Sequence, residues 1–141
     1  MFKLYAYDSD RNAPLEYVPA GAITPKLGLA LTFSSGVLAL ATGDAMPEYI
    51  CMTEGAAALT SGTLIPVMKV LPDMIFETTN QAALTNVAIG TKLTIHSDGA
   101  QVTATSGGAA KLMWKAADAS GSKVRVRFEA VDQVAEPEQD S

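Results

Sequence analysis

The side chains most often used in nucleophilic and metal chemistry are scarce, because the chain has one histidine and one cysteine. His96 precedes the turn 97–99 (Ser-Asp-Gly), and no G-x-S-x-G nucleophile elbow occurs in the sequence. We therefore expect His96 to have a structural role. Cys51 lies in an apolar run, 49–52, without a neighbouring cation to lower its pKa, and we expect it to be a small buried residue.

The acidic residues form two patterns that suggest chemistry. The segment 8–12 (D-S-D-R-N) resembles the start of a calcium loop, but Ala13 stands where that loop has glycine and Pro19 where it has a bidentate glutamate. Asp73 and Glu77 are four residues apart, so they share one face of a strand, which we expect to be an outer face. Carboxylates also pair through space, which the sequence leaves open. We predict no catalytic residue, no metal site and no cofactor.

Composition narrows the class of partner. The 141 residues are enough for one domain, and they carry a net charge of −5. Phosphate binding depends on clustered Lys and Arg, so this charge argues against a nucleic-acid partner. No apolar run approaches the ~20 residues of a membrane span, and the N-terminus lacks the apolar region of a signal peptide. We expect a soluble protein made in a cytoplasm, with neither a nucleic acid nor a membrane as partner.

Short apolar or alternating runs that end at Gly, Pro, Ser or Asp predict β-strands. In the clearest run, 123–129, Val124, Val126 and Phe128 face one way and charged residues the other. Helical patterns are nearly absent, so we predict an all-β fold, a small barrel or sandwich of short antiparallel strands. The positions expected in the core are Leu29, Leu31, Leu38, Leu40, Ile50, Leu64, Val67, Leu93, Ile95, Val102, Leu112, Val124, Val126 and Phe128.

The sequence also echoes itself at a spacing of about 63 residues. Residues 31–42 align with 94–105, 49–52 with 112–115, and, at a slightly shorter spacing, 61–67 with 120–126. Trp114 then aligns with Cys51, so we expect it in the core or at an interface. The echo indicates either an internal duplication, a barrel with pseudo-twofold symmetry to which each half gives about four strands, or a chance recurrence of Ser, Gly and Thr.

Four segments resemble small structural proteins encoded beside the major capsid protein of tailed phages, namely the head decoration or cement class. They are 22–31, 49–54, 62–67 and 92–99, and the resemblance extends over residues 2–129. It implies a β-rich, non-enzymatic protein that binds and stabilises the outer surface of the virion capsid. Its partner would be the major capsid protein, and it would bind as a homo-oligomer, with a trimer favoured. The alternatives are a carbohydrate- or ligand-binding barrel that uses Trp114 for stacking, and another virion part such as a tail or fibre module.

We divide the chain into an N-terminal arm or edge strand (1–20), a β-barrel domain (21–130) and an acidic mobile tail (131–141). The arm is rich in aromatic residues, which are enriched where protein surfaces meet. One hypothesis is that the arm contacts the capsid or a sister subunit; the other is that it adds an edge strand to the barrel. The contact residues under the first hypothesis are Phe2, Leu4, Tyr5, Tyr7, Arg11, Leu15 and Tyr17.

Overall fold

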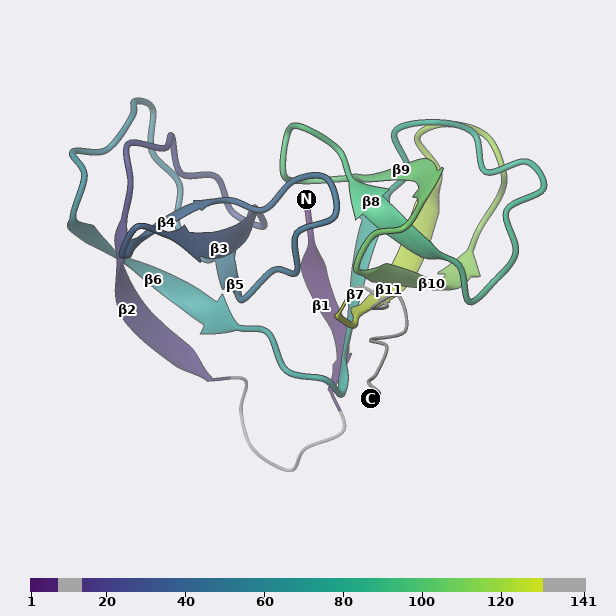
Figure 1. The fold of residues 1–141 in the computed structure, drawn as a ribbon, viewed down its shortest axis with the longest axis horizontal. Helices are drawn as coiled ribbons and strands as arrows, with labels where there is room; N and C mark the ends of the chain where they lie inside the picture. Colours follow the sequence, from purple (N-terminus) through teal and green to yellow (C-terminus); the bar gives the residue numbers. More distant parts are fainter. Residues whose placement is uncertain (8–13, 131–141) are drawn as a thin grey trace, which may run out of the picture.

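The computed structural model describes residues 1–7 and 14–130, which form eleven β-strands and no helix, so the all-β prediction is confirmed (Figure 1). Arg11, the calcium-like segment 8–12 and the predicted tail 131–141 lie outside the described residues. The strands are β1 (Lys3–Tyr7), β2 (Leu15–Ala20), β3 (Ala30–Ser34), β4 (Val37–Leu40), β5 (Tyr49–Cys51), β6 (Thr63–Lys69), β7 (Met74–Thr79), β8 (Lys92–Ile95), β9 (Val102–Ser106), β10 (Ala110–Lys115) and β11 (Lys123–Phe128).

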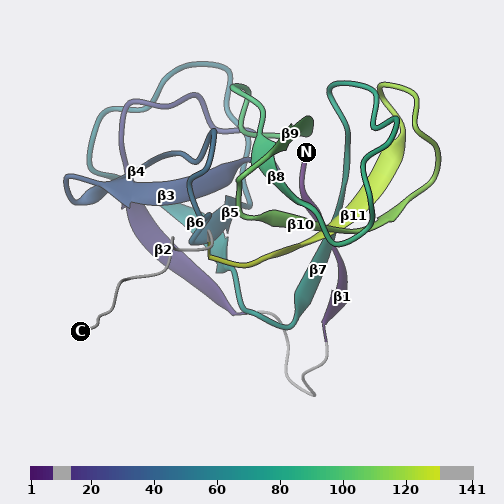
Figure 2. The ribbon, with the colours of Figure 1, turned by 45° about the vertical axis from the view of Figure 1, so that its right-hand side comes forward.

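The strands form two sheets that lie side by side (Figures 1 and 2). The first is a closed barrel with the order β2-β4-β3-β5-β6, and the second is a six-stranded sheet with the order β1-β7-β11-β10-β8-β9. The first 20 residues are divided between them, because β1 pairs with β7 while β2 pairs with β6 and β4. The arm is thus part of both sheets.

The two sheets repeat one topology. If β2 to β6 are matched in order with β7 to β11, every antiparallel pair of the barrel has its counterpart in the second sheet. The parallel pair that closes the barrel, Ala20 with Leu38, is matched by a parallel bridge between Asn80 and Val102. We call β2–β6 the first repeat and β7–β11 the second repeat.

The repeats also match in individual backbone hydrogen bonds, which a chance recurrence of turn residues would not produce. Gly21 N–H donates to Leu38 O (2.8 Å) in the first repeat, as Gln81 N–H donates to Val102 O (2.7 Å) in the second. Gly28 N–H to Cys51 O (2.8 Å) is matched by Gly90 N–H to Leu112 O (2.7 Å). Gly62 N–H to Ala20 O (2.7 Å) is matched by Gly121 N–H to Asn80 O (2.8 Å). The echo in the sequence is therefore a structural duplication. Each half builds its own five-stranded unit, and the expectation of one barrel with four strands from each half is wrong.

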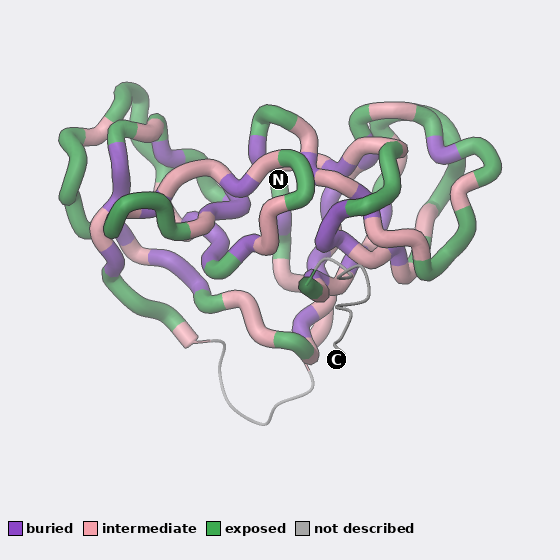
Figure 3. The backbone as a smooth tube through the Cα atoms, in the orientation of Figure 1, coloured by how far each residue is buried: buried purple, intermediate pink, exposed green. Residues whose placement is uncertain are grey.

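One apolar core lies inside the first repeat, and a larger one fills the second repeat and the junction between the sheets. In β5, Tyr49 and Cys51 face the barrel interior while Ile50 faces the second core, so the whole strand is buried. Gly43 and Ile95 exchange backbone hydrogen bonds of 2.8 Å across the junction. The two sheets therefore pack as one body (Figure 3).

Strand alternation explains the outcome at the predicted core positions. Twelve of the fourteen are buried, whereas Leu40 is half-buried and Leu64 is 60% exposed. Ile65 and Val67 face the barrel interior, so Leu64 faces outward. Placing both Leu64 and Val67 in the core was wrong, because residues three apart on a strand lie on opposite faces.

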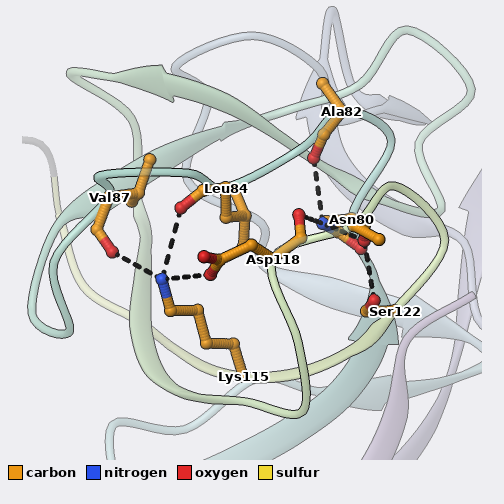
Figure 4. A network of polar contacts seen from close by, with 8 residues as sticks. Asn80, Ala82, Leu84, Val87, Lys115, Asp118 and Ser122 are labelled. Carbon is orange, nitrogen blue, oxygen red and sulfur yellow. Dashed lines mark hydrogen bonds and ion pairs between the residues drawn. The ribbon is translucent and has the colours of Figure 1, made fainter.

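A polar network holds the long loops of the second repeat together (Figure 4). The Asn80 side chain is buried, and its Nδ2 donates to Ala82 O (2.9 Å) and Ala119 O (3.0 Å). Lys115 Nζ lies 2.7 Å from Asp118 Oδ1 and donates to two carbonyl oxygens of the loop after β7. These bonds join the loop after β7 to the loop before β11, and Ala20 takes the place of Asn80 in the first repeat.

The core predicts a strong contrast between two truncations. Phe128 is 1% exposed, and its ring packs edge-on against Phe2 at 5.2 Å between centroids. Phe128→Ala should lower the free energy of unfolding by about 3–5 kcal/mol through lost transfer energy and a cavity. Leu64→Ala should change it by less than about 0.5 kcal/mol, because that side chain already faces water. Urea unfolding of both variants tests this, and equal losses would contradict the strand register.

The loop network predicts a second effect on stability. Asn80→Ala removes both donors and leaves two carbonyl oxygens without their partner, so the free energy of unfolding should fall by about 1–3 kcal/mol. Alanine itself fits the backbone, since Ala20 occupies the matching place. Asn80→Asp should cost more than Asn80→Ala, because it places a carboxylate against the two carbonyls. Thermal unfolding of the pair measures the order, and a neutral Asp variant would contradict the assignment.

Candidate protein-docking surface

The first repeat presents an apolar outer face formed by β2 and β6. Leu15, Tyr17 and Leu64 are 64%, 72% and 60% exposed. The register of the two strands places Leu15 opposite Met68, Tyr17 opposite Pro66 and Pro19 opposite Leu64, so all six side chains lie on one face. We call these six residues the apolar face; none is charged. Pro19 and Pro66 are half-buried, and Met68 is buried at the junction between the sheets.

A groove continues this face towards β1. It has a volume of about 460 Å³, within the range of ligand pockets, and Lys3 is the one charged residue among its described lining residues. Leu15 and Met68 belong both to the groove and to the apolar face, so the two surfaces are continuous. The lining residues are Met1, Phe2, Lys3, Leu4, Leu15, Leu27, Gly28, Met52 and Met68.

Gly28 sets the wall of the groove beside the start of β1. Phe2 N–H donates to Gly28 O at 2.8 Å, and a Cβ at Gly28 would lie 2.6 Å from Met1 Cβ and 2.8 Å from Phe2 O. The backbone there has a φ of +90°, which favours glycine. Only glycine therefore allows the 26–28 turn to approach β1 so closely.

The same face of the second repeat is charged. β2 aligns with β7 because Ala20 and Asn80 make the matching parallel contacts. β6 aligns with β11 because Gly62 and Gly121 make matching hydrogen bonds in the turns before these strands. Along these strands Tyr17 corresponds to Glu77, Pro66 to Arg125 and Met68 to Arg127, while Leu64 corresponds to Lys123. Leu15 and Pro19 correspond to Ile75 and Thr79, so four of the six positions of the apolar face carry a charged residue on the second repeat.

Ion pairs organise the charged face. Arg125 Nε lies 3.3 Å from Glu77 Oε2, and Arg127 Nη2 lies 2.9 Å from Glu129 Oε2. Lys92 and Lys111 each lie 3.7 Å from the same Glu129 carboxylate. The Arg127 hydrogen bond and the neighbouring positive charges hold the pKa of Glu129 below its usual value, so the carboxylate is ionised at neutral pH. Such a face is suited to contact with water.

The structure separates the predicted contact residues. Phe2 is 2% exposed and belongs to the core, and Leu4 and Tyr7 are half-buried. Tyr5 is exposed, but it lies on the charged face, with the Arg125 guanidinium 3.8 Å from its ring centroid. Of the described residues in that set, Leu15 and Tyr17 come together on the apolar face.

The β6 half of the apolar face, Leu64, Pro66 and Met68, was not predicted from the sequence. The alternation of Leu64 and Pro66 with Ile65 and Val67 is visible in the sequence, but both sets are apolar, so the pattern does not say which one faces the core. Trp114 was also misaligned, since the residue that matches Cys51 is Leu112. Leu112 is buried, whereas Trp114 is 39% exposed and has the Arg125 guanidinium 4.1 Å from its ring centroid.

The surroundings of Cys51 and His96 are consistent with structural roles. Cys51 is buried as expected, and burial raises the pKa of its thiol. His96 accepts a backbone hydrogen bond from Gly99 N–H through its carbonyl oxygen, at 2.9 Å. Over residues 1–7 and 14–130, no three His, Cys, Asp or Glu side chains lie close enough together to hold a metal ion. Within the same ranges, no helix has the length and apolar character to cross a membrane.

Comparison of the chain with protein-family models, with curated proteins and with solved structures gave no match.

Proposed function

We propose that this chain is a non-enzymatic virion protein that binds the outer surface of a tailed-phage capsid through the apolar face of its first repeat. The observation that carries the proposal is the contrast between the two repeats. The second repeat has Glu77, Lys123 and Arg125 at the positions of Tyr17, Leu64 and Pro66, so the fold itself does not require apolar side chains at these three positions. Contiguous exposed apolar residues are typical of a surface that another protein covers.

The size of the face bears on how binding is achieved. Burying a large apolar side chain contributes about 1.5–3 kcal/mol when it was fully exposed, and the three most exposed residues of the face are already partly covered. Together they supply roughly 3–6 kcal/mol, which offsets only the low end of the estimated 4–15 kcal/mol cost of association. Several linked copies would tighten binding, because linked sites bind with higher avidity. This supports a homo-oligomer on the capsid, with a trimer favoured.

The resemblance to head decoration proteins supplies the partner, the major capsid protein. The location is then the outer surface of the virion capsid, with the charged face of the second repeat in water. Neither a nucleic acid nor a membrane is part of the proposal, since the chain has a net charge of −5.

Mixing the protein with undecorated capsids tests the proposal. The wild-type protein should bind saturably at a fixed stoichiometry. The double variant Tyr17→Glu/Pro66→Arg copies the Glu77–Arg125 pair of the second repeat onto the apolar face and leaves the net charge unchanged. Because it replaces the apolar contact with ions that must lose water, it should bind capsids about tenfold or more weakly.

The control is Ile89→Glu, which adds a charge at an exposed apolar residue outside the apolar face. It should bind capsids as the wild type does, and thermal unfolding should show both variants folded. Equal binding by the double variant and the wild type would show that the partner surface lies elsewhere.

A further inference from the structure

The second repeat has an extra strand that the first repeat lacks. In the second repeat the closing bridge, Asn80 with Val102, lies beyond the end of β7. The edge of β7 before that bridge pairs with β1, in an antiparallel register that places Lys3 opposite Glu77 and Tyr7 opposite Met74. One repeat therefore shows that an extended segment can add to its first strand.

The matching edge of β2 is open. Within the described residues, β4 pairs with β2 only at Ala20, and no other strand joins β2 on that side. Gly21 N–H donates to Leu38 O across this edge. Because successive backbone groups on a strand point to opposite edges, those of Leu15 and Tyr17 point to the same open edge as Gly21, while Glu16 and Val18 point to β6.

We propose that an extended segment of another protein adds to this open edge of β2, antiparallel, in the place that β1 holds on β7. The backbone N–H and C=O groups of Leu15 and Tyr17 bond to the added strand, and Pro19 offers its carbonyl oxygen alone. Addition of a strand to an exposed sheet edge gives affinity through the main chain and specificity through alternate side chains. The inference rests on the proposed function and specifies how the apolar face is covered.

The neighbouring side chains define the chemistry of the added segment. On the second repeat, Tyr5 of β1 reaches over Arg125, its ring centroid 3.8 Å from the guanidinium carbon. The residue that matches Arg125 is Pro66, which lies between Leu64 and Met68 on the apolar face. The outward side chains of the added segment are therefore aromatic or aliphatic.

The negative charge of the chain favours a segment of a different protein, rather than a second copy of this chain, as the occupant of the open edge. Residues 14–70 contain four acids, Glu16, Asp44, Glu48 and Glu54, against two lysines, a net charge of −2, and the whole chain has −5. Glu16 is exposed on β2 itself, between the two residues that offer the open edge. Two copies would bring like charges together, whereas an apolar segment with a net positive charge is attracted. The occupant is thus an extended, apolar and weakly basic segment of a partner.

The strand β1 provides a probe of this composition. A capped peptide with the sequence of residues 2–7 (Phe-Lys-Leu-Tyr-Ala-Tyr) carries one positive charge, and it is titrated into the intact protein while amide hydrogen exchange is followed by NMR. In the free protein, the Tyr17 and Leu15 amides should exchange faster than Val18. Saturation with peptide should slow exchange at Tyr17 by about tenfold or more.

Backbone methylation separates strand addition from binding by side chains. Two versions of the peptide are N-methylated, one at its odd-numbered and one at its even-numbered residues. An added strand directs only one of these sets of N–H groups at β2, so one version should bind and the other should not. Equal behaviour of the two versions, or binding without slower exchange at Tyr17, overturns the inference. A Tyr17 amide already protected in a free protein of doubled mass also overturns it, because the occupant is then a second copy.

The capsid assay keeps this test distinct from that of the proposed function. If the peptide fails but Tyr17→Glu/Pro66→Arg still weakens capsid binding as expected, the apolar face binds in another way and only strand addition is overturned. If the peptide adds to β2 but the wild-type protein does not bind capsids, strand addition stands and the capsid role is overturned.

Discussion

The fold depends on how each repeat closes. A barrel of five strands needs its first and third strands to meet, and in both repeats they meet in parallel at one position, Ala20 with Leu38 and Asn80 with Val102. Because the contact is confined to the end of the first strand, the rest of that strand has a free edge. The second repeat covers this edge with β1, whereas in the first repeat no strand formed by the described residues covers it. The short contact between the first and third strands thus leaves room for β1 on β7, and it leaves the candidate docking edge on β2.

The duplication allows two sequences to be compared on one backbone. Inward positions such as Ile65 and Val124 are buried in both repeats, as the core demands. Outward positions differ, since Pro66 is matched by Arg125 and Tyr17 by Glu77, which form an ion pair in the second repeat. The fold therefore tolerates ions at the outward positions of Tyr17 and Pro66. Under the proposed function, this contrast reflects different surroundings for the two faces, water for the charged one and a partner protein for the apolar one.

Alternation and turn residues in the sequence predicted the strands and most of the core, because these patterns are local. The duplication was visible only where turns recur; the first strands, β2 and β7, share no obvious sequence pattern, so the five-stranded unit was missed. The division of the arm was not predictable either, since Lys3 pairs with Glu77, more than 70 residues away. The apolar face escaped prediction because β6 is apolar on both sides, and only its pairing with β2 shows which side is exposed.

An open strand edge beside apolar side chains favours pairing between copies, and natural β-sheet proteins usually protect such edges with charge, proline or a covering segment. On β7 the covering segment is β1. On β2 the edge has Pro19, which lacks an N–H, and Glu16, whose carboxylate repels an identical strand. The net charge of −5 adds to this repulsion between copies. These features oppose pairing of this edge with the same edge of a second copy, and they leave the bonding groups of Leu15 and Tyr17 unblocked for the proposed partner segment.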